Sequence, residues 1–130
     1  MMKNDILNRE DLLLLMDRFY SKALTDTMIG HYFTEVVHLS LQKHIPVITD
    51  FWESVLFDTG KYYGNTMKVH EDLHEKSPFQ SAHFNRWIEM FKETVDENFV
   101  GNNAEKIKQR AISIATVMNI KMVHGGAGLK

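Results

Sequence analysis

The feature that most constrains the fold of this chain is the spacing of its apolar side chains, which recur every three or four residues in almost every long segment. One clear series lies between Asn8 and Thr25 and contains Leu12, Leu15, Met16, Phe19, Tyr20 and Ala23. This spacing places the side chains on one face of an α-helix with Asn8 at its N-cap. We find no sustained alternation of apolar and polar residues and no hairpin signal. The sequence therefore predicts an all-α fold.

A second helix is expected after Ser40, on a stripe that contains Leu41, Ile45, Ile48, Trp52, Val55 and Leu56. Pro46 restricts this helix because proline fits only a first turn. The helix therefore either begins near Ile45 or is kinked just after His44. Asp58-Thr59-Gly60 is expected to end it. The segment 26–37 before this helix is interpreted as a helical turn or an irregular connection, and Tyr62-Tyr63-Gly64-Asn65 as an exposed loop.

Two further helices are expected in the second half of the chain. Ser77-Pro78 has the composition of a helix start, and it is followed by the aromatic-rich stripe Phe84, Trp87, Ile88, Phe91, Val95 and Phe99. Gly101 separates this helix from the last one, whose inward residues are expected to be Ile107, Ala111, Ile114, Ala115, Met118 and Met122. The last helix is expected to end at His124. The pattern as a whole predicts roughly four substantial helices and several short ones.

Length and composition narrow the function classes. The chain has 130 residues, no cysteine and a formal net charge of −2. We expect one domain over residues 1–130, with tails at about 1–7 and 125–130. The absence of cysteine removes disulfides, thiolate nucleophiles and zinc-thiolate sites. There is no basic stripe for nucleic acid, no signal-peptide pattern and no apolar run that could cross a bilayer, so a soluble cytoplasmic protein is expected.

Polar groups point inward together with the aromatic residues. On the expected helices, Tyr20, His44, His70 and Trp87 all lie on inward faces or their flanks. Each aromatic residue alone is explained by ordinary core packing. A buried hydroxyl, indole N–H or imidazole without a partner, however, costs about 1–3 kcal/mol. Convergent polar groups in an aromatic pocket fit a bound planar cofactor better than plain packing.

The order and spacing of several motifs carry a family resemblance. These motifs are Phe19-Tyr20, His44 followed by Phe51-Trp52, His70 after Tyr63-Gly64-Asn65-Thr66-Met67-Lys68, Pro78-Phe79, and Phe84-Asn85-Arg86-Trp87. Together they resemble the truncated haemoglobins over about residues 12–118. The chain is most similar to the group III branch, because the paired glycines that mark the interhelical corners of groups I and II are missing here. The resemblance implies a truncated globin fold, a helical sandwich around a haem.

The resemblance also implies roles for individual residues toward haem b. His70 would be the proximal ligand of the iron, with its second ring nitrogen donating to a backbone carbonyl about one turn earlier. Tyr20, His44 and Trp87 match the distal positions, with Tyr20 as the principal hydrogen-bond donor to a diatomic ligand and Trp87 as the second. Residues that could also contact the porphyrin are Phe33, Ile48, Phe51, Trp52, Leu73, Phe79, Phe84, Trp87, Phe91, Ile114 and Met118. Lys68 and Arg86 could meet the haem propionates, although surface cations are usually just solvated.

A competing motif overlaps the same segment. His70-Glu71-Asp72-Leu73-His74 satisfies H-E-x-x-H, the pattern of zinc proteases. Its context is poor, because Ser77-Pro78 ends the helix soon after His74 and no third ligand follows at the expected distance. A zinc hydrolase using His70, Glu71 and His74 is thus the least supported option, and His74 is interpreted as an exposed or loop-facing residue. The other histidines are expected at the surface, namely His31, His38, His83 and His124.

The leading hypothesis is a haem protein that reversibly binds dioxygen, nitric oxide or carbon monoxide. Crowded distal donors suggest redox handling or sensing rather than transport. We expect no dedicated enzymatic activity beyond haem-based redox chemistry, a diatomic gas ligand, an unidentified reductase as a possible partner, and a monomer or weak dimer. The alternative from another class is a non-haem helical module whose aromatic groove takes a partner helix or an apolar small molecule.

Overall fold

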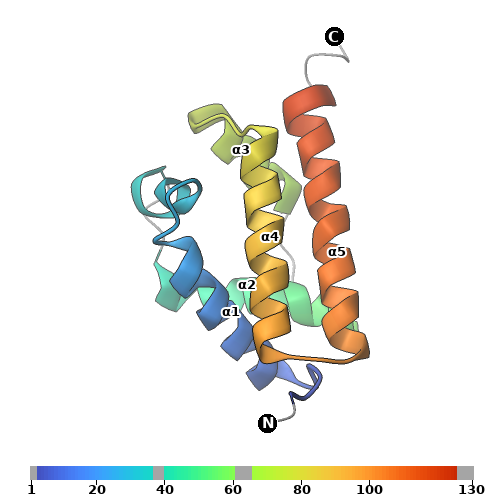
Figure 1. The fold of residues 1–130 in the computed structure, drawn as a ribbon. Helices are drawn as coiled ribbons and strands as arrows, with labels where there is room; N and C mark the ends of the chain where they lie inside the picture. The colour runs from blue at the N-terminus through green and yellow to red at the C-terminus, as the bar shows by residue number, and fades with distance from the viewer. Residues whose placement is uncertain (1–2, 37–39, 61–65, 126–130) are drawn as a thin grey trace.

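A computed structural model describes residues 3–36, 40–60 and 66–125 (Figure 1). Within these ranges every regular element is helical, which confirms the predicted all-α class. The elements are α1 (Arg9–Ala23), the π-helical segment η1 (Tyr32–Val36), α2 (Leu41–Phe57), α3 (Thr66–Lys76), α4 (Ser81–Asn98), α5 (Asn102–Asn119) and the π-helical segment η2 (Ile120–Gly125). The loop predicted at Tyr62-Tyr63-Gly64-Asn65 and the surface position predicted for His38 lie outside the described residues, as does the side chain of His124.

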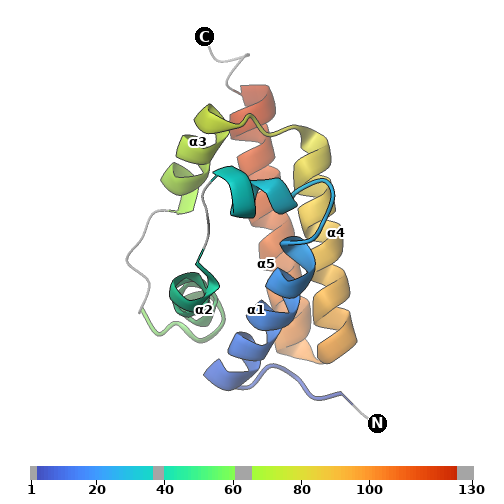
Figure 2. The ribbon, with the colours of Figure 1, turned by 90° about the vertical axis from the view of Figure 1, so that its left-hand side faces the viewer.

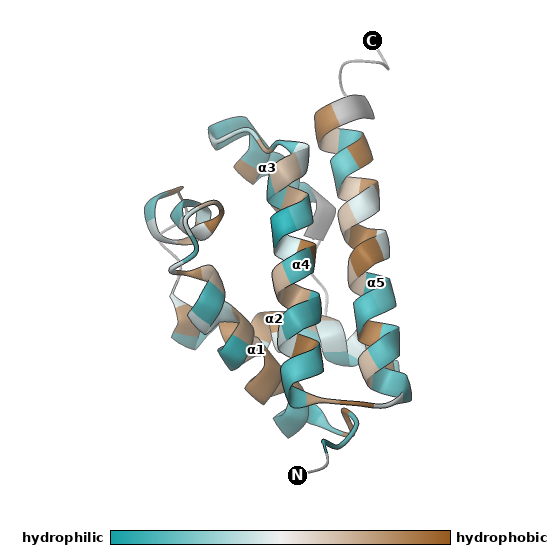
Figure 3. Cartoon of the chain, in the orientation of Figure 1, coloured by the Kyte–Doolittle hydropathy of each residue, from teal (hydrophilic) through white to brown (hydrophobic). Residues whose placement is uncertain are grey.

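The helices form two groups that meet at α1. Helices α4 and α5 run antiparallel and side by side, and α1 packs against both α2 and α4 (Figure 1). Seen from the side, α2 and α3 lie apart from each other, with η1 near α3 (Figure 2). Each helix carries a polar side and an apolar side (Figure 3). No helix in the described ranges is both long enough and apolar enough to cross a membrane.

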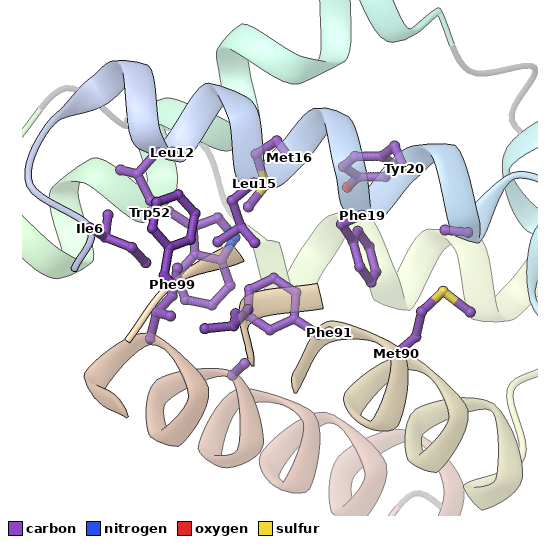
Figure 4. Packing of buried hydrophobic residues seen from close by; sticks show 14 of the residues in the cluster. Ile6, Leu12, Leu15, Met16, Phe19, Tyr20, Trp52, Met90, Phe91 and Phe99 are labelled. Carbon is purple, nitrogen blue, oxygen red and sulfur yellow. The ribbon is translucent and has the colours of Figure 1, made fainter. Parts of the chain in front are cut away.

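Helix α1 follows the sequence pattern closely. Asn8 is its N-cap, and the Asn8 side chain accepts a hydrogen bond from the backbone N–H of Asp11. The six apolar residues predicted to face inward are all buried. They meet the apolar residues of α2 and α4 in the core shown in Figure 4, where Phe19 contacts Phe91 edge to face at a centroid distance of 5.4 Å.

Helix α2 begins at Leu41, so the expectation that it starts near Ile45 is wrong. The carbonyl of Ser40 already accepts a hydrogen bond of 2.9 Å from the His44 backbone N–H, which closes the first turn before Pro46. Pro46 has no backbone N–H, so it cannot donate the helical hydrogen bond to the carbonyl of Gln42. Since Gln42 is exposed, water can satisfy that carbonyl, and the proline is tolerated inside the helix. The helix ends before Asp58, which is left-handed with φ of 56°, as the Asp58-Thr59-Gly60 signal predicted.

Helix α4 begins at Ser81, so the predicted start at Ser77-Pro78 is wrong. Gln80 is the N-cap residue, and its backbone N–H donates to Nδ1 of His83 at 2.9 Å. The segment 77–80 is therefore a connection rather than a first turn. Proline favours a helix start but does not require one, and here the cap lies two residues beyond it.

The N-terminal segment caps α5 from a distance. The carboxylate of Asp5 accepts hydrogen bonds from the backbone N–H groups of Asn103 and Ala104, at 2.9 and 2.8 Å. Gly101 leaves room for this contact, because a Cβ there would lie 2.4 Å from the Asp5 side chain. Its φ of +147° is also a value that glycine tolerates and other residues rarely adopt.

Candidate haem site

A cavity of about 300 Å³ lies among the helices. Side chains from α1, η1, α2, α3, α4, α5 and the connection 77–80 all line it. The lining is almost entirely aliphatic and aromatic, with Tyr20, His44 and His70 among its few polar groups. A cavity of this kind suits a flat apolar molecule that needs a small number of fixed polar contacts.

Helix α3 borders the cavity with its inner face uncovered. None of the described α3 side chains, from residue 68 to residue 76, is buried, and Val69 is 59% exposed although it lines the cavity. The backbone of α3 comes close mainly to η1. An isolated helix of 11 residues is marginal in water. The uncovered face of α3 therefore fits a group that fills the cavity and packs against it.

Tyr20 and His44 form a polar pair in the cavity wall. The hydroxyl of Tyr20, on α1, lies 2.8 Å from Nε2 of His44, near the start of α2. Burial raises the pKa of Tyr20, so its hydroxyl stays protonated. Burial also lowers the pKa of His44, and the charge of His70 lowers it further. The pair is therefore neutral at neutral pH. His44 and His70 line the same cavity.

His70 lies on α3 and lines the same cavity in a half-buried position. Its ring is 6.4 Å from the ring of Phe79, at a tilt of 36°. Trp87, the third predicted distal residue, lines the cavity from α4. It stacks on Phe91 at 5.2 Å and 16°, so its ring plane is fixed by packing. The structure thus brings together the four polar residues singled out in the sequence.

The apolar side chains predicted to contact a porphyrin also gather here. Lining the cavity are Phe33, Ile48, Phe51, Trp52, Leu73, Phe79, Phe84, Phe91, Ile114 and Met118. Trp52 stacks on Phe91 at 5.3 Å, so two of the lining rings are packed against each other. The residues named by the resemblance thus line one common cavity.

Lys68 and Arg86 do not line the cavity. Lys68 pairs with Asp72 one turn further along α3, and its side chain is 70% exposed. Arg86 forms ion pairs with Asp26, at 2.8 Å, and with Glu89. The Arg86 guanidinium is thus paired with these two carboxylates, outside the cavity lining. The structure thus gives neither cation a place at the cavity wall.

Sequence reasoning missed several residues of the site. The additional lining residues are Met16, Phe19, Ile29, Tyr32, Val69, His83 and Ala115. Met16 and Phe19 belong to the stripe predicted on α1, so the inward pattern could have indicated them. His83 was expected at the surface, which is wrong, because it is half-buried and caps the start of α4. Burial and the charge of His31 lower the pKa of His83.

The geometry does not assemble the zinc site of the H-E-x-x-H motif. Nδ1 of His74 accepts the backbone N–H of Phe79 at 2.8 Å, so this nitrogen is engaged with the following connection, as the loop-facing interpretation predicted. Glu71 is exposed. Across the part of the chain that the structure describes, no three histidine or acidic side chains are grouped to hold a metal ion.

The all-helical architecture and an apolar cavity lined by His70 and by the Tyr20–His44 pair agree with a globin of the truncated class. No family model matches the chain. It is 34% identical, over 96% of its length and 99% of the relative's, to a group 3 truncated haemoglobin of Campylobacter jejuni subsp. jejuni serotype O:2. It also matches the crystal structure of the group III truncated haemoglobin from Campylobacter jejuni, with a TM-score of 0.85, 28% identity, and coverage of 95% of this chain and 97% of that one.

The chain belongs to the group III truncated haemoglobins, which confirms the family expected from its motifs. It is therefore a member of a family of haem-binding globins.

Proposed function

We propose that this chain binds haem b in the cavity, with a ring nitrogen of His70 as the axial ligand. The observation that carries the proposal is that His70 from α3 and the Tyr20–His44 pair from α1 and α2 line one cavity that is otherwise apolar. Imidazole is a common axial ligand of haem iron, and apolar walls suit the porphyrin. Bound haem would supply an iron centre that takes up a diatomic ligand. The uncovered inner face of α3 fits this group.

Tyr20, His44 and Trp87 would surround the diatomic ligand. The hydrogen bond between Tyr20 and His44 can run in either direction, because neutral imidazole has two tautomers. When His44 carries its proton on Nε2, it donates to the Tyr20 oxygen, and the Tyr20 hydroxyl is then free to donate into the cavity. Tyr20 is accordingly the principal donor to the ligand, Trp87 the second, and His44 the residue that sets the direction of the bond.

The ligand class follows from these donors. Dioxygen held by a haem iron would carry partial negative charge on its outer atom, so hydrogen-bond donors aimed at that atom would slow its release. Several donors in one small cavity favour retention of dioxygen or polarisation of its bond over rapid delivery. Redox handling or sensing of dioxygen, nitric oxide or carbon monoxide is therefore the proposed role, with an external reductase supplying electrons.

Titration of the purified protein with haemin tests this proposal. We expect a Soret band that saturates at one haem per chain, and a ferrous carbon monoxide complex with a single sharp band. A protein that stays colourless but binds an apolar fluorescent probe would instead support the non-haem module. One zinc and no iron per chain after expression would contradict the haem proposal directly.

A further inference from the structure

The connection between α3 and α4 is held by side chains at three consecutive backbone positions. The Tyr32 hydroxyl donates to the carbonyl of Pro78 at 2.9 Å. The N–H of Phe79 donates to Nδ1 of His74 at 2.8 Å, and the N–H of Gln80 donates to Nδ1 of His83 at 2.9 Å. Surface connections commonly leave such groups to water. Here three ring-bearing side chains hold them in one arrangement.

This connection places Phe79 against the proposed haem ligand. The Phe79 ring lines the cavity, with its centroid 6.4 Å from that of His70. On its other sides it stacks on His74 at 5.7 Å and 19°, and it contacts Tyr32 at 4.7 Å. Phe79 is therefore wedged between the cavity and the groups that hold the connection.

His74 links the Phe79 ring to α3. It lies four residues after His70, on the same face of the helix. Its ring makes two contacts with one residue, the hydrogen bond to the Phe79 N–H and the stacking on the Phe79 ring. No side chain of α3 between residues 68 and 76 is buried, so the two contacts of His74 act together with the packing of Leu73 against the core to set the rotation of the helix about its own axis. That rotation decides where the ring of His70 points.

We propose that His74 is a positioning residue for the proximal side of the site. By accepting the Phe79 N–H and stacking on the Phe79 ring, it fixes α3 against the connection 77–80 and thereby holds the His70 ring in one orientation. This inference rests on the proposed role of His70 as the haem ligand. We therefore expect the orientation of the His70 ring to depend more on a hydrogen-bond acceptor at residue 74 than on an aromatic ring there.

Two substitutions separate the acceptor from the ring. His74→Phe keeps an aromatic ring for stacking but has no acceptor, whereas His74→Asn keeps an acceptor near the position of Nδ1 but has no ring. Glu75→Gln is the control, since Glu75 is an exposed residue of the same helix and does not line the cavity. All variants are prepared as haem-bound protein.

Three readouts are measured on each variant. The first is the iron–histidine stretching band of the ferrous protein in resonance Raman spectra, which reports the orientation of the proximal imidazole. The second is hydrogen exchange of the Phe79 amide. The third is the rate of haem transfer to an acceptor apoglobin.

In His74→Phe we expect a shifted and broadened stretching band, Phe79 exchange about tenfold faster, and haem transfer about three- to tenfold faster. His74→Asn should restore all three toward the parent values, and Glu75→Gln should leave them unchanged. A His74→Phe protein that loses haem while His74→Asn keeps it also supports the proposal.

An unchanged stretching band in His74→Phe would overturn the inference. Failure of both residue 74 variants to hold haem would also overturn it, because that result would indicate a general role of His74 in folding. The proposed function fails in a different way. In that case the parent protein itself shows no iron–histidine band, and the inference about His74 is refuted along with it.

Discussion

At the scale of single residues, the site depends on the neutral pair of Tyr20 and His44. Both groups are held in uncharged forms by burial, which raises the pKa of the Tyr20 hydroxyl and lowers that of the His44 imidazole. A neutral pair can reverse its hydrogen bond at little cost, whereas a charged pair in an apolar cavity would hold one direction. This freedom allows the Tyr20 hydroxyl to turn toward a ligand in the cavity.

Replacing Tyr20 by phenylalanine removes one hydroxyl and keeps the ring that packs against Phe19 and Phe33. We expect dioxygen to dissociate at least about tenfold faster from Tyr20→Phe, because a buried hydrogen bond to a partly charged acceptor is worth about 1.5–3 kcal/mol. Trp87→Phe should give a smaller increase. Stopped-flow displacement of dioxygen by carbon monoxide measures both rates, and unchanged rates in both variants would refute the donor assignment.

At the scale of elements, the helices differ in how firmly they are held. Helices α1, α4 and α5 each bury five or more side chains, whereas α3 buries none between residues 68 and 76. The stability of a short helix comes mainly from packing of its apolar face. We therefore expect the stability of helix α3, which carries His70, to depend most on the proposed haem.

Hydrogen exchange should reveal this difference in haem-free protein. We expect the amides of α3 to exchange at least about tenfold faster than those of α4, and addition of haem to protect α3 more than any other element. Mass spectrometry of peptides spanning residues 66–76 and 81–98 gives both values from one experiment. Equal protection of α3 and α4 without haem would contradict this account of α3.

The start of α5 offers a separate test that does not involve haem. Burial alone would raise the pKa of Asp5, but hydrogen bonds from the backbone N–H groups of Asn103, Ala104, Ile6 and Asn102 outweigh it and hold the pKa below its ordinary value. The carboxylate therefore stabilises the fold at neutral pH, and this contribution is lost as the pH falls through the lowered pKa.

Asp5→Ala should reduce the free energy of unfolding by about 0.5–2 kcal/mol at neutral pH, as for other helix caps. Asp5→Asn keeps an acceptor but no charge, so its deficit relative to the parent should shrink as the pH falls from about 5 to below 4. Urea unfolding at several pH values measures both effects. Glu105→Gln, in the first turn of α5, is the control, because Glu105 pairs with Lys108 at the surface. A pH-independent deficit in Asp5→Asn would contradict the assigned role.

At the scale of the whole molecule, local periodicity predicted the fold class, and the family resemblance named most of the residues that line the cavity. The stripe on α1 and the motif residues around His44, His70 and Trp87 are short-range patterns, and the structure places them as expected. The surface position predicted for His83 failed because its partner lies far along the chain, and the ion pair of Arg86 was not predicted for the same reason. His83 contacts Tyr32, 51 residues away, and Arg86 pairs with Asp26, 60 residues away. Such pairings follow from the tertiary arrangement, which periodicity within one helix does not reveal.

The helix start at residue 77 failed for a related reason. Ser77-Pro78 has the composition of a helix start, but Pro78 and Phe79 are held by Tyr32 and by His74 instead. These two contacts turn the chain toward the cavity before α4 begins. A local signal was thus overridden by tertiary contacts at the site itself.

The central claim is that His70 holds haem in this cavity, and the absorption spectrum of ferrous His70→Gly tests it most directly. We expect the variant to lose the parent Soret spectrum and to regain it when imidazole is added, because free imidazole can occupy the space left by the side chain. His31→Ala, a histidine outside the cavity lining, should keep the parent spectrum throughout. A parent-like Soret spectrum of His70→Gly without imidazole would contradict the claim.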